Sequence, residues 1–232
     1  LPDPSSNKQR ASQESNVIML LSPTFSAIMA SLPSDLYETV LSRFLDFISN
    51  NVYYSATDAI ALICSTIVRD NPQGVFPRIF PMLKANIETE ILENGAGSVR
   101  SGSEILPRDR TLIWYLSILN MSLSNAYEEV LNFKKEILEL TIFLRDHTKG
   151  SIIFHVSNAV HHALISLSLT MIKDYGIIPD RFNKIAGKDV TLKNWGEKIK
   201  SQDLKFEWYT ISREGIEYAF ELYKAHVEKS LT

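Results

Sequence analysis

The stretch that decides the fold class is SIIFHVSNAVHHALISLSLTMI, residues 151–172, which contains no charged side chain. Its apolar residues are distributed around the whole circumference of a helix rather than along one stripe. A helix of this kind is buried between neighbouring elements. The stretch therefore predicts a helix packed between other helices, and we expect it to run from Ser151 to Tyr175 and to pair with a last helix over Ser212–Leu231.

The rest of the chain shows one amphipathic helical pattern after another. The clearest follows Pro33-Ser34-Asp35, and its apolar stripe is Leu36, Val40, Leu41, Phe44, Leu45 and Ile48. The main breaks fall at Pro33, Pro72, Pro107 and Gly150, so the intervals are roughly 35 to 43 residues long, close to HEAT or armadillo units. The pattern predicts an all-α fold, an α-solenoid of HEAT/armadillo-like helix pairs with a long structured loop before the last helix.

Composition limits the classes of function. Among 232 residues, 45% are hydrophobic and 22% are charged, which is typical of a globular protein with a sizeable core. The net charge of −3 argues against an electrostatic nucleic-acid binder, since such proteins present a basic face. No apolar run reaches the roughly 18 residues that a membrane span needs, and no secretory signal is visible. We therefore expect neither nucleic acid nor a membrane as a partner.

Cysteine usage excludes two further kinds of site. The single cysteine, Cys64, rules out an intrachain disulfide and a multi-cysteine zinc site, which suits a reducing compartment. Cys64 lies within the apolar run AIALICSTIV, so we interpret it as a buried packing residue.

The organisation along the chain follows from these patterns. The chain begins with Leu1 rather than Met, so we expect it to be a piece of a longer polypeptide. Residues 1–15 are polar and lack periodicity, which indicates a connector or the rim of an insertion. Residues 16–175 are expected to form HEAT-like repeats, 176–211 a loop rich in tryptophan and lysine, and 212–232 a further repeat helix. Within the first repeat, Ser22 and Pro23 are expected to start a helix.

A search for catalytic and metal sites finds no convincing arrangement. The glycines of GAGSVRSG, residues 95–102, have neither the dinucleotide-binding nor the P-loop spacing. His155, His161 and His162 lack the i, i+4 spacing of a zinc-binding helix, and adjacent histidines point about 100° apart. No G-x-S-x-G motif is present. We interpret the histidines as structural, and we expect no enzyme, no metal and no cofactor.

The segment NWGEKIKSQDLKFEWYTI, residues 194–211, has the most distinctive sequence in the chain. It is rich in lysine, yet Trp195 and Trp208 indicate that it packs against other residues. Ser212 then caps a helix with Glu214 in its first turn. The expected apolar face of that helix is Ile216, Ala219, Phe220, Tyr223 and Val227.

This segment resembles the giant HEAT-repeat proteasome activators, the bleomycin-linked activator of fungi and proteasome activator subunit four of animals. The resemblance rests on Trp195-Gly196, the run Leu204–Tyr209 and the helix with Ser212, Tyr218-Ala219-Phe220 and Leu222, with weaker similarity at Ser157-Asn158 and 161–164. It implies a non-enzymatic activator that caps the core particle, contacts the α-ring and promotes gate opening. The implied partners are the core-particle α-ring and the rest of a longer chain. The implied locations are nucleus and cytoplasm, with roles in DNA repair and proteasome assembly.

Activators of this family end in a tyrosine-bearing tail that opens the gate. Tyr53-Tyr54 is internal and the present chain ends in Ser230-Leu231-Thr232, so we interpret the tyrosine pair as interhelical packing. The family also binds inositol phosphates at basic openings. On that resemblance, Lys193, Lys198 and Lys200 are candidate contacts for a polyphosphate or an acidic partner. A solvated loop is the alternative, because interspersed acidic residues dilute the positive field.

Two other classes of function stay open at this point. A karyopherin-like or scaffold solenoid would bind protein cargo along a concave face, and an acidic groove or a row of asparagines would favour it. A helical enzyme would need a clustered polar pocket that the sequence alone does not assemble. If the chain is part of such an activator, we expect its structural landmarks to be Trp195, Trp208 and Phe220.

Overall fold

The computed structural model describes the backbone of residues 4–97, 105–168, 171–177 and 204–227, and side chains within 16–97, 105–168 and 210–227. It separates into two compact units, Leu1–Leu167 with Glu214–Thr232, and Ser168–Arg213. The helical unit contains the helices α1 Pro4–Ser31, α2 Ser34–Asn50, α3 Thr57–Asp70, α4 Pro72–Asn94, α5 Arg110–Leu123, α6 Glu129–Asn132, α7 Lys134–His147, α8 Ile152–Ser168 and α11 Arg213–Val227. Short 3₁₀ turns lie at Tyr54–Ala56 and Pro107–Asp109. The last residue of α8 and the first residue of α11 fall just outside the bounds of this unit.

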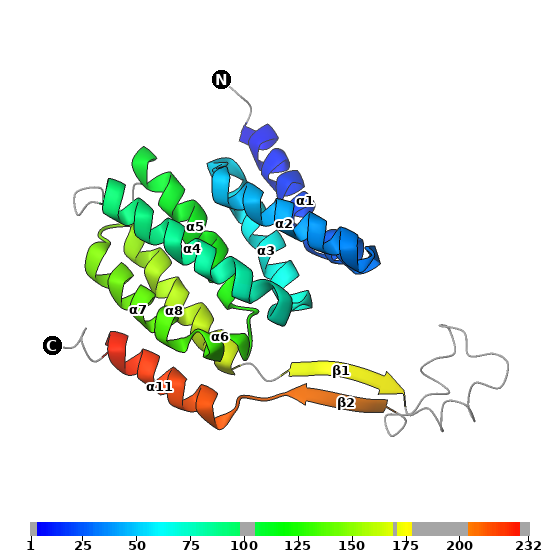
Figure 1. The fold of residues 1–232 in the computed structure, drawn as a ribbon. Coiled ribbons are helices and arrows are strands. Elements are labelled where there is room, and N and C mark those ends of the chain that lie inside the picture. The colour runs from blue at the N-terminus through cyan, green and yellow to red at the C-terminus, as the bar shows by residue number, and fades with distance from the viewer. Residues whose placement is uncertain (1–3, 98–104, 169–170, 178–203, 228–232) are drawn as a thin grey trace. The chain divides into compact units, whose positions relative to one another are not determined.

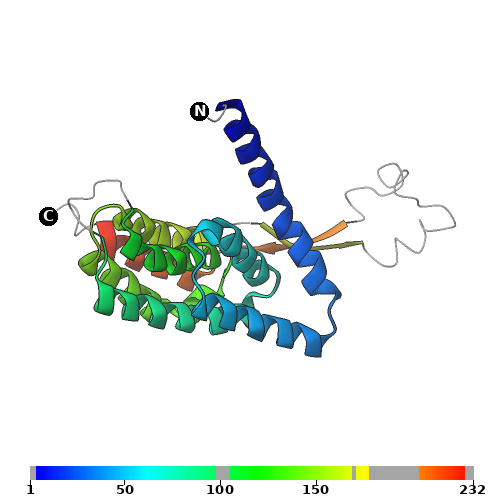
Figure 2. The same cartoon turned by 90° about the horizontal axis from the view of Figure 1, so that it is seen from above.

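The helices of this unit form pairs that stack in two layers (Figure 1). Figure 2 shows α2 and α4 along one side and α3 and α5 along the other. Helix α3 packs against α5, α4 and α1, and α5 also packs against α4. The predicted α-solenoid of helix pairs is confirmed. None of the helices within the described ranges is long and apolar enough to cross a membrane.

Large aromatic side chains form part of the core of this unit. Phe76, Phe80 and Phe133 form an aromatic cluster whose ring centroids are 5.2–5.7 Å apart. Trp114 of α5 is fully buried. Each side chain of this size contributes about 1.5–3 kcal/mol through burial, so these residues hold the two layers together.

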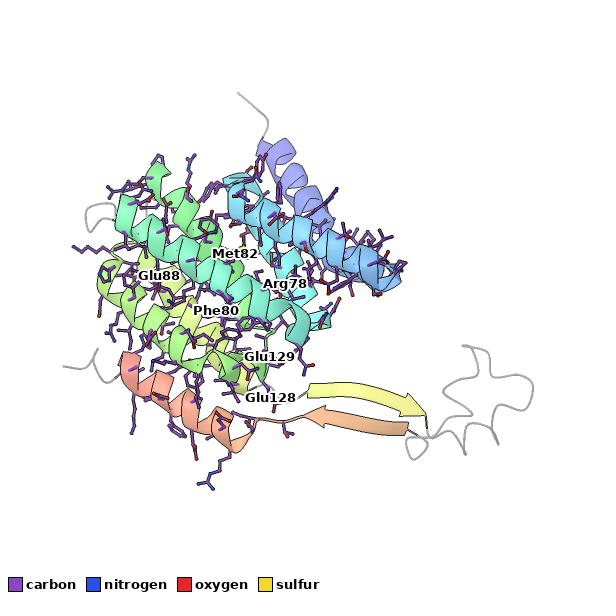
Figure 3. The ribbon with its side chains drawn as sticks, viewed as in Figure 1. Arg78, Phe80, Met82, Glu88, Glu128 and Glu129 are labelled. Carbon is purple, nitrogen blue, oxygen red and sulfur yellow. The ribbon has the colours of Figure 1, made fainter. Side chains whose placement is uncertain are left out.

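Polar side chains fix the helices relative to one another within the unit. Arg78 of α4, labelled in Figure 3, donates to Glu38 and to Ser42 of α2 at 2.9 Å each. Two of the last carbonyl oxygens of α2 accept hydrogen bonds from side chains of α5. Trp114 Nε1 donates to Ile48 O at 3.1 Å, and Tyr115 Oη donates to Ser49 O at 2.8 Å. These carbonyls have no partner within their own helix, so α5 completes the C-terminus of α2.

Helix α1 differs from the prediction at its start. It begins at Pro4, so the expected connector at 1–15 is helical from Pro4 onward, and Pro23 lies inside the helix instead of starting it. The prediction was wrong because it relied on apolar periodicity, which 4–15 lack. Half of those residues are strong helix formers, namely lysine, glutamine, arginine, alanine and glutamate.

Helix α8 ends at Ser168, so the expected helix to Tyr175 is wrong over its last residues. In the second unit, β1 Met171–Ile177 pairs antiparallel with β2 Leu204–Tyr209, with an irregularity between Ile172 and Asp174. The run LKFEWY alternates apolar and charged residues up to Trp208, which is a strand pattern, and Gly176 is unfavourable within a helix. The segment predicted as an irregular loop thus contains one strand of a two-stranded ribbon.

Helix α11 packs through a different face from the expected one. Tyr218 is 2% exposed and Leu222 is fully buried, whereas Phe220 is 63% exposed. Four hydrogen bonds join α11 to α7: Tyr218 Oη to Lys134 O at 2.8 Å, Lys134 Nζ to Glu214 Oε1 at 2.7 Å, Arg145 Nη1 to Ala225 O at 2.6 Å, and His226 Nε2 with Thr141 Oγ1 at 3.0 Å. The prediction of the face with Ile216, Phe220 and Tyr223 was wrong because the polar anchor of Tyr218 decides the docked face.

Candidate functional site: a polar groove across α3, α5 and α8

A groove of about 400 Å³ crosses the helices α3, α5 and α8, and Ile18 of α1 borders it. We refer to it as the α3–α5–α8 groove. Its polar lining consists of Asp58, Ser117, Asn120, His155, Asn158 and His162. Its apolar lining includes Leu62 and Met121. Both kinds of side chain therefore face the same space.

The positions of these residues follow from helical periodicity. On α8, His155, Asn158 and His162 are three and four residues apart, which places them on one face. On α3 and α5 the lining residues follow the same three- and four-residue spacing. Because α3 packs against α5 and Asn120 of α5 bonds α8, the three faces meet at the groove.

Asn120 is the most buried polar residue of the groove, with 4% of its surface exposed. Its Nδ2 donates to the backbone oxygen of His155 at 3.0 Å, which joins α5 to α8. Within the described part of the chain, neither Asn120 Oδ1 nor His162 Nδ1 has a hydrogen-bond partner. Native proteins pair more than nine buried polar groups in ten, so two such atoms in one groove are unusual.

The two groove histidines are uncharged at neutral pH. Burial lowers the pKa of His155, against a smaller opposing effect of the Asp58 carboxylate. Burial also lowers the pKa of His162, and the neighbouring His161 lowers it further. Desolvation disfavours the imidazolium in both cases. Among the side chains that the structure describes, Asp58 is consequently the only charged one in the lining.

The three predicted histidines are not brought together as metal ligands. His162 lies in the groove, whereas the exposed His161 next to it points elsewhere, as expected for adjacent helical residues. Across the described residues, no group of three or more histidine, cysteine or acidic side chains is placed to hold a metal ion.

Cys64 and the tyrosine pair occupy structural positions. Cys64 is fully buried, which confirms its predicted packing role, and burial raises its pKa so that the thiol is unreactive. The Tyr53 ring stacks on Phe47 of α2 with centroids 5.8 Å apart, and the guanidinium of Arg110 lies 5.2 Å from the centre of the Tyr54 ring. The Tyr54 contact agrees with the predicted interhelical packing, since Arg110 belongs to α5. Tyr53 instead is 54% exposed and packs on the helix that precedes it.

The predicted polyphosphate contacts, Lys193, Lys198 and Lys200, lie outside the described residues, as does Trp195. Trp208 belongs to β2, but its side chain also lies outside the described part. Phe220, the third landmark, is on the exposed face of α11. Phe220 is not among the residues that line the groove.

Sequence reasoning missed the groove because it treated each helix separately. It interpreted His155 and His162 as structural and did not consider Asn120. The available signal was the polar triplet His155, Asn158 and His162 on one face of an otherwise apolar helix.

Comparisons with known proteins agree on one family. Residues 1–232 match the family described as "Proteasome activator complex subunit 4, mid HEAT repeats region". The chain is 31% identical over 166 residues to Proteasome activator BLM10 of Saccharomyces cerevisiae, covering 68% of this chain and 7% of that protein. It is 26% identical over 212 residues to Proteasome activator complex subunit 4B of Danio rerio, covering 89% and 11%.

A human relative extends this similarity over nearly the whole chain. The chain is 23% identical over 223 residues to Proteasome activator complex subunit 4 of Homo sapiens, which covers 94% of this chain and 12% of that protein. The chain therefore spans about a tenth of the length of the curated relatives it matches.

Proposed function

Because the chain belongs to the family of the proteasome activator complex subunit 4 mid HEAT-repeat region, we propose that it forms part of the wall of a proteasome activator. That activator caps the core particle, contacts its α-ring and promotes gate opening. The chain contributes by surface shape and stacking of helix pairs, and it carries out no catalysis. Its partners are the core particle and the flanking repeats of the same activator.

The observation that carries this proposal is the family match over residues 1–232. The stacked helix pairs of the solenoid support it, because such repeats build extended walls by stacking on their neighbours. The same match favours the activator over a karyopherin-like or scaffold solenoid that binds cargo.

We further propose, from the resemblance, that the activator acts in nucleus and cytoplasm and takes part in DNA repair and proteasome assembly. Lys193, Lys198 and Lys200 are proposed contacts for an inositol phosphate. Calorimetric titration of the natural full-length protein with inositol hexakisphosphate, before and after replacing the three lysines by glutamine, tests that contact. Imaging of a fluorescent fusion tests the location.

The main experiment uses the natural full-length protein and latent core particle. We expect the two to comigrate on a native gel, and we expect the mixture to hydrolyse a fluorogenic peptide several-fold faster than core particle alone. Phe80→Ala, which removes a buried ring from the segment, should weaken stimulation, because substitutions of this type cost about 3–5 kcal/mol of stability.

Phe154→Ala is the matched control, since Phe154 of α8 is largely exposed. It should leave binding and stimulation unchanged. The proposal fails if the unaltered protein neither binds nor stimulates the core particle. It also fails for this segment if Phe80→Ala unfolds residues 72–123 in limited proteolysis yet stimulation persists.

A further inference from the structure

The α3–α5–α8 groove has the properties of a ligand site that the activator function does not use. Its volume of about 400 Å³ lies within the range of small-ligand pockets. Apolar side chains form part of its surface and a few polar groups converge on it, which is the usual composition of such pockets. The chemistry of those groups limits what can bind.

The groove is lined by two residues with buried polar side-chain atoms that lack hydrogen-bond partners among the described residues. Asn120 is held in place because its Nδ2 bonds the backbone of α8, so its Oδ1 is the atom left for a ligand. His162 Nδ1 likewise has no partner among the described residues. A buried acceptor without a donor destabilises the folded protein, and a ligand N–H would satisfy it. The groove therefore favours a ligand rich in N–H donors.

The charge of the groove lining further limits the class of ligand that can bind. Asp58 is the only charged group among the described residues of the lining, and the lowered pKa values of His155 and His162 keep both imidazoles neutral. No cation faces the groove from α3, α5 or α8. The groove thus disfavours phosphate and carboxylate ligands and favours a cation.

We infer that the α3–α5–α8 groove receives the guanidinium group of an arginine side chain from an extended peptide. The guanidinium carries five N–H donors in a fixed plane and is always protonated. Its donors suit the Asp58 carboxylate and Asn120 Oδ1 of the groove lining. The aliphatic stem of the arginine packs on Leu62 and Met121. A lysine ammonium, with a compact charge and three donors, matches this set less well.

The test compares three blocked pentapeptides, Gly-Ser-X-Ser-Gly, in which X is arginine, lysine or citrulline. Each is titrated calorimetrically into the natural full-length protein. Citrulline keeps the shape of arginine but loses its charge. We expect the arginine peptide to bind at least about tenfold more tightly than the citrulline peptide, because charge-assisted hydrogen bonds are lost.

Two substitutions locate the binding site. Asp58→Asn should weaken the arginine peptide by about tenfold. Asp35→Asn is its control, because both aspartates lie in the first turn of a helix and both are exposed, but Asp35 is outside the groove. Asn120→Leu removes the buried acceptor, and it should abolish the preference for arginine over lysine.

The inference fails under any of four results. These are no binding of the arginine peptide, equal binding of the citrulline peptide, equal effects of Asp58→Asn and Asp35→Asn, or competition by inositol hexakisphosphate at the same site. Asp58 is exposed, so its variant tests the idea even if Asn120→Leu does not fold. None of these readouts depends on proteasome stimulation, so the outcome is independent of the proposed function.

Discussion

At the scale of single residues, the bonds from α5 to the end of α2 are the most specific contacts of the core. Tyr115 is largely buried, and its hydroxyl donates to Ser49 O at 2.8 Å. Tyr115→Phe removes only that donor and leaves a part-buried carbonyl without it. We expect a loss of about 1–3 kcal/mol in the free energy of unfolding, measured by urea denaturation of the full-length protein.

Tyr223→Phe on the exposed face of α11 is the control for this change and should stay within about 0.5 kcal/mol of the unaltered protein. Equal unfolding midpoints for the two variants would mean that Ser49 O does not depend on Tyr115.

His226 gives the fold a dependence on pH. Burial lowers its pKa in the folded state, and Arg145 lowers it further against a smaller opposing effect of Asp146. Below the ordinary histidine pKa of about 6.5 the unfolded chain binds more protons than the folded one. This contribution is complete above that pH and is lost as the pH falls below it.

We therefore expect unfolding temperatures to decrease between pH 7.5 and pH 5.5. His226→Gln keeps a hydrogen-bonding group near Thr141 but cannot be protonated. Its unfolding temperature should therefore fall less over this pH range. His147→Gln changes an exposed histidine and serves as control. The same decrease in both variants would show that His226 does not contribute.

Some residue environments could be predicted from the sequence and others could not. Cys64 lies in a continuous apolar run, so its burial followed directly from local sequence. The partners Trp114 and Ile48 are 66 residues apart, and nothing in either neighbourhood specifies the other. The role of Asn120 could not be predicted for the same reason, because the groove that it lines forms only where faces of three helices meet.

At the scale of elements, α11 offers a direct comparison of its two faces. Leu222 is fully buried, and Leu222→Ala should cost about 2–5 kcal/mol. Phe220→Ala on the exposed face should change stability by no more than about 0.5 kcal/mol. Hydrogen exchange of the α11 amides in the full-length protein distinguishes the two outcomes, since undocked helices exchange faster. If Phe220→Ala lowered the stability more than Leu222→Ala, α11 would pack through the face predicted from the sequence.

Element boundaries explain where the sequence prediction succeeded and where it failed. Prolines and glycines marked the ends of helices correctly at Pro33, Pro72 and Gly150. The end of α8 was missed because apolar residues continue past Ser168 into β1, so composition does not change where the structure does. The face of α11 was missed because hydrophobicity alone does not register the hydroxyl of Tyr218, which bonds α7.

At the scale of the whole molecule, the helix pairs and their approximate length followed from periodicity, and the family followed from aromatic positions near the end of the chain. The present chain corresponds to about a tenth of its curated relatives. We expect it alone neither to hydrolyse a fluorogenic peptide nor to stimulate latent core particle. The natural full-length protein is the positive control, and several-fold stimulation by the 232-residue chain would contradict the expectation.

The dependence of α2 on α5 also bears on how the chain is made. A ribosome adds roughly 5–20 residues per second, so Trp114 emerges roughly 3–13 s after the Ile48 carbonyl that it bonds. During those seconds the last turn of α2 lacks the hydrogen-bond donors that α5 provides. The apolar side chains of α2 also lack the surface of α5 against which they pack. The nascent segment is thus expected to be a substrate for ribosome-associated chaperones until α5 leaves the exit tunnel.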